Sequence, residues 1–314
     1  MSSSGYRERV RRGLRRLLLP SKASTPPRWK YRWSIGIYEG TSPLTLRPAE
    51  HALNPVLTRD DVSDLDAEFV ADPFMVNADG RWYMFFEVAN RRLSKGEIAL
   101  AISADGFKWA YGGVVLTEPF HLSYPYVFTH EAEYYMIPET LPRAAIRLYR
   151  SSRFPYEWTC VGTLVSGRPF SDSSIVHAFE RWWLFSSASS DAAHDTLRLY
   201  WADELTGPWR EHPRSPIIAG NPHAARPAGR VLANERSVIR FAQDCAPEYG
   251  LSVQAFEVTE LTLQTYSERI LGTPILQGTG FGWNAAGMHH IDAHPFANGT
   301  WIACVDGWCR EPLS

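Results

Sequence analysis

The sequence has few cysteines and no long apolar run, and both absences narrow its class. Four of the 314 residues are cysteine, namely Cys160, Cys245, Cys304 and Cys309, which is too few for a disulfide framework in a chain of this length. No 18-residue apolar run and no apolar segment of signal-peptide type occurs, so neither a spanning helix nor secretion is indicated. We expect reduced thiols and a cytoplasmic location.

Several motifs that are typical of cofactor-binding loops or of catalytic nucleophiles are also missing. The sequence contains no GxGxxG, GxxxxGK[ST] or GxSxG, which argues against a phosphate-binding loop and a nucleophile elbow. Cys304 and Cys309 lack CxxC spacing and a second cysteine pair, so a zinc site is not expected. We expect no cofactor, no metal and no nucleic-acid partner. The one metal alternative is a divalent ion near His290, because strand alternation places His290, Asp292 and His294 on one side.

The near-neutral net charge of −2 hides a basic N-terminal segment. Residues 1–32 carry ten Lys or Arg against one acid, whereas the remainder is strongly acidic. Apolar residues at 10, 14, 17 and 18, with arginines between them, predict an amphipathic helix that ends at Pro20. Residues 6–19 could therefore contact an anionic membrane surface peripherally; a solvated extension is the alternative. We assign residues 1–28 to this tail and linker, and residues 29–314 to a second domain.

A hairpin over residues 71–87 carries a carboxylate at each end. A short apolar run from residue 73 to 76, turn chemistry at 77–80 and an aromatic run at 82–86 predict two antiparallel strands. The start of the first strand and the end of the second lie side by side. Asp72 and Glu87 should therefore share one edge of the sheet, and paired carboxylates are typical of sites that cleave or transfer glycosidic bonds.

The same hairpin recurs at a period of about 50 residues, which is in the range of propeller blades. A third and a fourth strand follow four of the hairpins, and the last hairpin has almost no chain after it. We therefore predict an all-β, five-bladed β-propeller, closed into a ring by N-terminal strands from residue 33 that complete the last blade. The five hairpins cover residues 71–87, 124–139, 172–186, 226–243 and 290–306.

Chemically active residues cluster at one end of these hairpins. The starts of the first strands and the ends of the second strands should converge there, whereas the hairpin turns at the other end carry ordinary loop residues such as Asn77 and Asp79. The converging residues are Asp72, Tyr124, Asp172, Arg226, His289 and His290 from first strands, and Glu87, Glu139, Ser187, Gln243 and Asp306 from second strands.

Several short motifs in the chain resemble those of a known protein family. The run HLSYPYVF at residues 121–128 is the most specific, and ADPF at 71–74, FFE at 85–87, IPE at 137–139, QDC at 243–245 and HHID at 289–292 accompany it. Together they resemble the N-terminal domain of the glucosamine inositolphosphorylceramide transferase family, over about residues 33–308. Bacterial proteins carry this domain alone or beside formyltransferase-like domains. Plant members add a C-terminal glycosyltransferase domain that does not occur here.

This resemblance implies roles for individual residues. The domain is similar to the five-bladed propellers of arabinanases, xylosidases and levansucrase-like enzymes, in which three acids surround a central pocket. By that likeness Asp72 is the base or nucleophile and Asp172 the carboxylate that sets pKa values. Glu139 is the expected acid, with Glu87 in reserve, although the arabinanase acid comes from a later blade. We expect the substrate to be positioned by His121, Tyr124, Arg226, Gln243, His289, His290 and Asp292.

Each of these residues also has a structural interpretation. A carboxylate in an Asp-Pro pair often only caps a turn, and Arg226 could neutralise buried acids instead of binding substrate. We therefore predict an enzyme that hydrolyses or transglycosylates a glycan or glycolipid, in the cytoplasm or at the inner membrane surface. The alternative is a non-catalytic carbohydrate-binding propeller that assists a partner glycosyltransferase or formyltransferase. A protein-interaction scaffold is a third, weaker hypothesis.

Overall fold

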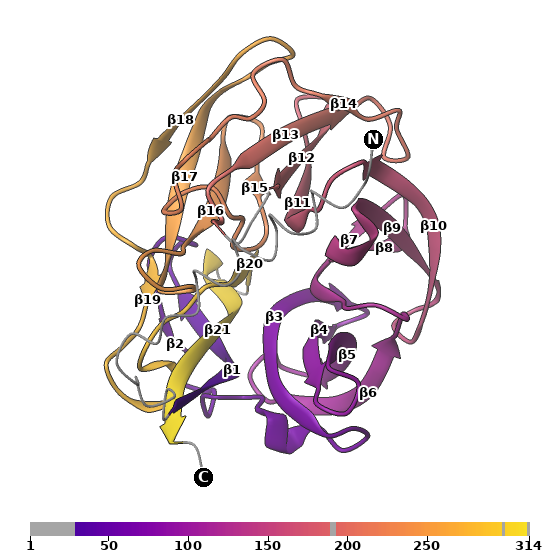
Figure 1. Ribbon diagram of the computed structural model, residues 1–314. Helices are drawn as coiled ribbons and strands as arrows, with labels where there is room; N and C mark the ends of the chain where they lie inside the picture. Colours follow the sequence, from indigo (N-terminus) through magenta and orange to yellow (C-terminus); the bar gives the residue numbers. More distant parts are fainter. Residues whose placement is uncertain (1–28, 189–192, 297–298, 313–314) are drawn as a thin grey trace, which may run out of the picture. The chain divides into compact units, whose positions relative to one another are not determined.

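Antiparallel sheets of four or five strands recur five times in the computed structural model (Figure 1). The structure describes residues 29–188, 193–296 and 299–312, so the basic helix predicted over residues 6–19 lies outside the described residues. Residues 31–310 form one compact unit. Within it, the five sheets form the five-bladed β-propeller that the repeats predict.

The first three sheets follow the chain in strict order, each strand pairing with the next. The 3₁₀ helix η1 (Arg59–Asp61) precedes the first sheet, and η2 (Leu141–Arg143) connects two strands of the second sheet. The first sheet contains β3 (Ala67–Ala78), β4 (Arg81–Asn90), β5 (Lys95–Ser103) and β6 (Ala110–Leu116). The second contains β7 (Ser123–His130), β8 (Glu133–Glu139), β9 (Ala145–Arg153) and β10 (Glu157–Ser166). The third contains β11 (Ser171–Ala178), β12 (Arg181–Ser187), β13 (Leu197–Ala202) and β14 (Arg210–Glu211).

The fourth sheet departs from the prediction at its innermost strand. The sequence predicts a strand over residues 226–231, but the regular strand is only β15 (Leu232–Ala233). Pro227 has no N–H to donate to a ladder. Gly229 has φ 132° and approaches the next sheet so closely that a Cβ would lie 1.7 Å from the Ile291 carbonyl oxygen. The rest of this sheet is β16 (Val238–Asp244), β17 (Ser252–Leu261), β18 (Tyr266–Ile270) and β19 (Leu276–Gln277).

The fifth sheet joins the two ends of the chain. Its strands are β20 (Ile291–Pro295), β21 (Trp301–Pro312), β1 (Trp29–Gly40) and β2 (Leu46–Pro48), in that order from the inside outward. Figure 1 shows the indigo β1 beside the yellow β21. The predicted closure by N-terminal strands is therefore confirmed. A third 3₁₀ helix, η3 (Gly282–Asn284), lies between β19 and β20 along the chain.

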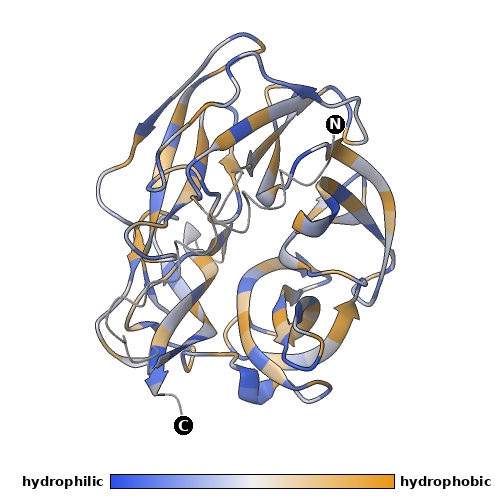
Figure 2. Cartoon of the chain, in the orientation of Figure 1, coloured by the Kyte–Doolittle hydropathy of each residue, from blue (hydrophilic) through white to orange (hydrophobic). Residues whose placement is uncertain are grey.

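The innermost strands contact one another in a closed circle. β20 contacts β3, β3 contacts β7, β7 contacts β11, and β11 contacts β15. A bridge between Gly229 and Ile291 returns from the fourth sheet to the fifth. Inner strands are thus buried by neighbours as well as by their own sheets, and Figure 2 shows apolar stretches in the strands of every sheet.

Tryptophans fasten the outer edges of three sheets in the same way. The indole N–H of Trp109 donates to the Gly106 carbonyl at 2.9 Å, and Trp158 donates to the Pro155 carbonyl at 2.9 Å. Trp209 donates to a carbonyl four residues earlier at 3.0 Å. Each indole thus provides a hydrogen bond to the backbone of the turn that precedes its own outer strand. Among the described residues, no helix has the length and apolarity needed to cross a membrane.

Candidate functional site

Three inner strands contain the same backbone irregularity, near the start of β7 and β11 and within β3. Asp72, Tyr124 and Asp172 have φ values of 54°, 46° and 46°, in the left-handed region that non-glycine residues rarely adopt. Each lies at a break in the register of its hairpin. Such bulges redirect side chains and recur beside functional sites. We call this part of the propeller the entry end, and the part at the hairpin turns the turn end.

The N–H groups at these bulges bind carboxylates of the preceding blade. Asp72 N–H donates to Asp306 Oδ2 at 2.9 Å, and Tyr124 N–H donates to Asp72 Oδ2 at 3.3 Å. Asp172 N–H donates to Glu139 Oε2 at 3.1 Å. The strained backbone therefore links carboxylates of the fifth, first and second blades to the next blade along the circle.

Asp72 links two blades of this arrangement, and one of its carboxylate oxygens accepts no hydrogen bond from the described residues. Its residue is 6% exposed, and Oδ1 has no hydrogen-bond partner among the described residues. The nearest ring nitrogens are His289 Nε2 at 3.8 Å and His290 Nδ1 at 3.9 Å. Burial raises the pKa of Asp72 to about 7, while the His289 charge lowers it and that of Asp172 raises it.

Glu139 and Asp172 share an arginine. Arg226 Nε donates to Asp172 Oδ2 at 2.6 Å, and Gln243 Nε2 donates to the same oxygen at 2.7 Å. Arg226 Nη2 lies 3.7 Å from Glu139 Oε2. Burial and then the charge of Asp172 raise the pKa of Glu139 to about 8, against the opposing charge of Arg226. Asp172 is thus held in an ion pair, whereas Glu139 keeps its proton at neutral pH.

Glu87 and His121 form a second pair at the entry end. Gly96 N–H donates to His121 Nδ1 at 2.8 Å, so the neutral ring carries its proton on Nε2, which lies 3.6 Å from Glu87 Oε1. Burial raises the pKa of Glu87 well above its usual range, and the charge of Asp72 raises it further. Burial lowers the pKa of His121. Both shifts favour the uncharged forms of Glu87 and His121.

The two adjacent histidines differ sharply in their surroundings. His289 Nδ1 donates to Asp306 Oδ1 at 2.7 Å, and the ring stacks on Trp33 with centroids 4.0 Å apart. Burial lowers the pKa of His289, but the charge and hydrogen bond of Asp306, together with the charges of Asp72 and Asp172, outweigh burial and the net shift is upward. His290 has no hydrogen-bond partner on either ring nitrogen among the described residues, and burial lowers its pKa to about 4.

Two residues predicted to bind substrate lie deeper than expected. Tyr124 is fully buried, and its hydroxyl bonds Ser174 Oγ at 2.8 Å, so its side chain belongs to the interior of the propeller. Asp292 is also fully buried and pairs with Arg230 at 2.5 Å and His294 at 2.9 Å, away from the entry end. Strand alternation predicts the side that a residue faces, but it does not predict how deep the side chain lies along an inner strand.

Three aromatic residues at the entry end were not among the predicted site residues. Trp33 stacks on His289, and the guanidinium of Arg226 lies 5.0 Å from the Tyr249 ring. Arg226 Nη1 donates to His194 Nδ1 at 2.9 Å. Trp33 lies in the strand that closes the last blade, so the predicted closure already placed Trp33 near the entry end. His194 comes from an irregular connection without periodic pattern.

One group of side chains has the spacing of a metal site. Among the described residues, ligand atoms of Asp72, His289 and Asp306 all lie within 4.8 Å of one another. The run of His290, Asp292 and His294 forms no such group there, since Asp292 is engaged by His294 and Arg230. Any divalent ion at the entry end would therefore be held by the first set.

Sequence comparison identifies similar proteins over most of the chain. The family described as "Glucosamine inositolphosphorylceramide transferase 1, N-terminal" matches residues 29–308. The protein of that name in Oryza sativa subsp. japonica is 37% identical over 296 residues, and the one in Arabidopsis thaliana is 32% identical over 298. Each match covers 88% of this chain but only 40% or 39% of the relative.

Solved structures of glycoside hydrolases share the fold. The catalytic domain of an α-L-arabinofuranosidase from Coprinopsis cinerea has a TM-score of 0.59 at 14% identity, covering 88% of this chain and 97% of that one. An α-L-arabinanase from Cellvibrio cellulosa has a TM-score of 0.55 at 16% identity, covering 79% and 92%. At such identities the likeness concerns the fold alone.

Proposed function

The chain belongs to the family of the glucosamine inositolphosphorylceramide transferase 1 N-terminal domain, and from its carboxylate cluster we propose that it processes a glycan or glycoconjugate by glycoside hydrolysis or transglycosylation. The chain spans about two fifths of its relatives' length, so the proposal rests on the residues of the propeller and not on the activity in the relatives' name.

One observation carries the proposal: backbone hydrogen bonds hold the buried carboxyls of Asp72 and Glu139 at the entry end. Burial raises the pKa of Asp72 to about 7 and that of Glu139 to about 8. Both carboxyls are therefore suited to proton transfer near neutral pH. A carboxylate and a carboxylic acid at the same pH are what glycosidic bond cleavage requires.

The hydrogen bonds assign a task to each oxygen. Asp72 Oδ2 is occupied by Tyr124 N–H, which leaves Oδ1 to attack the anomeric carbon or to activate water. Glu139 Oε2 accepts Asp172 N–H, which leaves Oε1 to carry the proton for the leaving group. Asp172 holds Arg226 and raises the pKa of Glu139. Glu87 is the reserve acid.

The family suggests where to look for a substrate. The relatives' name refers to an inositolphosphorylceramide, so glycolipids belong in a substrate screen beside soluble glycans. A glycolipid substrate would agree with a cytoplasmic protein that touches the inner membrane surface through residues 6–19. Those residues lie outside the described part, so this location is part of the proposal.

A non-catalytic carbohydrate-binding role is the second candidate. The observation in its favour is the tight ion pair of Asp172 with Arg226 at 2.6 Å, since acids locked by cations support binding better than proton transfer. In that case the propeller would present glycan to a partner glycosyltransferase or formyltransferase. The unpartnered Oδ1 of Asp72 favours the enzyme.

Turnover of glycosides by matched variants tests the choice. We would screen aryl glycosides and bacterial surface glycolipids with the wild type, Asp72→Asn, Glu139→Gln and the exposed control Glu68→Gln. The enzyme hypothesis expects turnover by wild type and control, and its loss in Asp72→Asn with every substrate. Glu139→Gln should lose turnover of the glycolipids and of other substrates whose leaving group must be protonated. Both site variants should remain folded at pH 6. Glycan binding without turnover in all four proteins would support the binding role, and unfolding of the site variants at pH 6 would contradict the catalytic assignment.

A further inference from the structure

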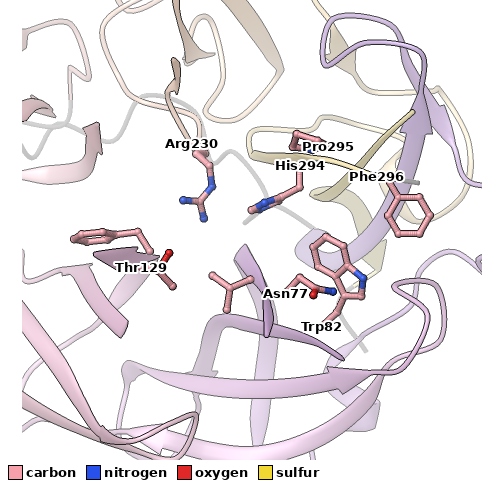
Figure 3. A pocket seen from close by; sticks show the side chains of 9 residues that line it. Asn77, Trp82, Thr129, Arg230, His294, Pro295 and Phe296 are labelled. Atoms are coloured by element: carbon pink, nitrogen blue, oxygen red, sulfur yellow. The ribbon is translucent and has the colours of Figure 1, made fainter. Parts of the chain in front are cut away.

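A cavity opens at the turn end of the propeller, where the sequence indicated only ordinary turns. Its volume is about 670 Å³, which suits a small-molecule ligand. Its walls include Asn77 near the end of β3, Thr129 near the end of β7, His294 in β20, and Arg230 (Figure 3). Two inner strands that carry a left-handed bulge at the entry end, β3 and β7, therefore end at this cavity.

A layer of buried rings separates the cavity from the entry end. Phe74, Tyr124 and His290 are fully buried, with ring centroids 4.5 to 5.3 Å apart. The guanidinium of Arg230 lies 5.9 Å from the Phe74 ring. A strand rises about 3.3 Å per residue, so Asn77 lies roughly 15 Å along β3 from Asp72. A ligand in this cavity would not touch the carboxylate cluster.

Among the described residues, the cavity is lined by the basic residues Arg230 and His294 and by no acid. Arg230 Nε donates to Asp292 Oδ1 at 2.5 Å, Arg230 Nη2 donates to the Val127 carbonyl at 2.8 Å, and the side chain keeps 15% exposure. His294 Nε2 lies 2.9 Å from Asp292 Oδ2. Asp292 is fully buried and does not line the cavity. Two basic side chains thus share one hidden carboxylate, which favours a ligand that brings a negative charge.

Aromatic and uncharged polar groups complete the lining. Trp82 packs against His294 and Phe296, with centroids 5.7 and 6.1 Å away. The side chains of Asn77 and Thr129 are exposed and have no hydrogen-bond partner among the described residues. Apolar rings beside free amide and hydroxyl groups suit a ligand with both C–H faces and hydroxyls. We propose that this cavity binds a monosaccharide-sized sugar that carries an oxyanion, either a carboxylate or a phosphate.

Isothermal titration calorimetry of the full chain tests the proposal with four probes: glucuronate, glucose 6-phosphate, glucose and inorganic phosphate. The proposal expects one or both charged sugars to bind more tightly than glucose and more tightly than phosphate. Which charged sugar binds better identifies the oxyanion. Thr129→Val should weaken binding about fivefold, the effect of one lost hydrogen bond. Asn77→Ala should weaken it by at least as much.

Thr163→Val is the matched control, because Thr163 is also exposed in a strand but lies in the outer strand β10. It should leave binding unchanged. Binding of glucose equal to that of both charged sugars would refute the charge requirement, and binding of phosphate equal to theirs would refute the sugar requirement. Absence of binding by all probes, or binding that is lost in Asp72→Asn and unaffected by Thr129→Val, would overturn the site.

Discussion

Replacing Glu139 by glutamine should stabilise the protein at alkaline pH. Burial and the Asp172 charge raise the pKa of Glu139 from its usual 4.5 to about 8. Between these values the native state binds more protons than the unfolded state, so the free energy of unfolding falls as the pH rises. Glutamine has the same shape, accepts the Asp172 N–H, and carries no charge that must be buried.

The size of the effect follows from the shift. A displacement of 4.5 to about 8 corresponds to on the order of 5 kcal/mol of unfolding free energy, lost progressively up to about pH 8. At pH 5 the wild type has lost only about 1 kcal/mol of this. The difference between Glu139→Gln and wild type should therefore grow from about 1 kcal/mol at pH 5 to several kcal/mol at pH 9.

Urea unfolding followed by tryptophan fluorescence at pH 5, 7 and 9 measures this difference. Glu68→Gln is the control, since Glu68 is exposed and has no ion-pair partner among the described residues; its difference from wild type should stay constant with pH. A Glu139→Gln variant that is equally or less stable than wild type at pH 9 would refute the burial of an uncompensated carboxyl at this position.

Three further changes probe the fold and the network. Tyr124→Phe removes the hydroxyl bonded to Ser174 and should lower the unfolding free energy by about 1–3 kcal/mol; an unchanged urea midpoint would contradict its interior role. Ile37→Ala empties a fully buried position in the closing strand β1 and should destabilise by about 2–5 kcal/mol; a negligible loss would contradict closure by β1. Arg226→Met removes the charge that lowers the pKa of Glu139, so a carboxyl ¹³C NMR titration should show that pKa raised above its wild-type value, and a fall would contradict the network.

Much of the architecture follows from the chain's repeated hairpins. Alternation and turn chemistry predict the five sheets, and the lack of a third and a fourth strand after the fifth hairpin (290–306) predicts the closure by β1 and β2. The first strand of the fourth hairpin is not predicted correctly. Its Pro227 and Gly229 adapt to the neighbouring sheet, a tertiary contact that a local pattern does not contain.

In the candidate site, too, some features follow from local sequence patterns and others depend on tertiary contacts. Asp72, Glu139 and Asp172 come together because the hairpin argument fixes which strand ends meet. The depth of Tyr124 and Asp292 was not predictable, because it depends on left-handed bulges and on Arg230 from another blade. The cavity at the turn end was missed for a related reason: its lining residues are individually ordinary, and only the circle of inner strands makes them a site.

The pH dependence of turnover tests the central claim most directly. With a responsive glycoside, the wild-type rate should be bell-shaped, rising as Asp72 ionises near pH 7 and falling as Glu139 loses its proton near pH 8. With an aryl glycoside whose leaving group needs no protonation, Glu139→Gln should retain activity and lose the alkaline limb. Turnover that keeps its alkaline limb in Glu139→Gln, or that survives in Asp72→Asn, would contradict the account.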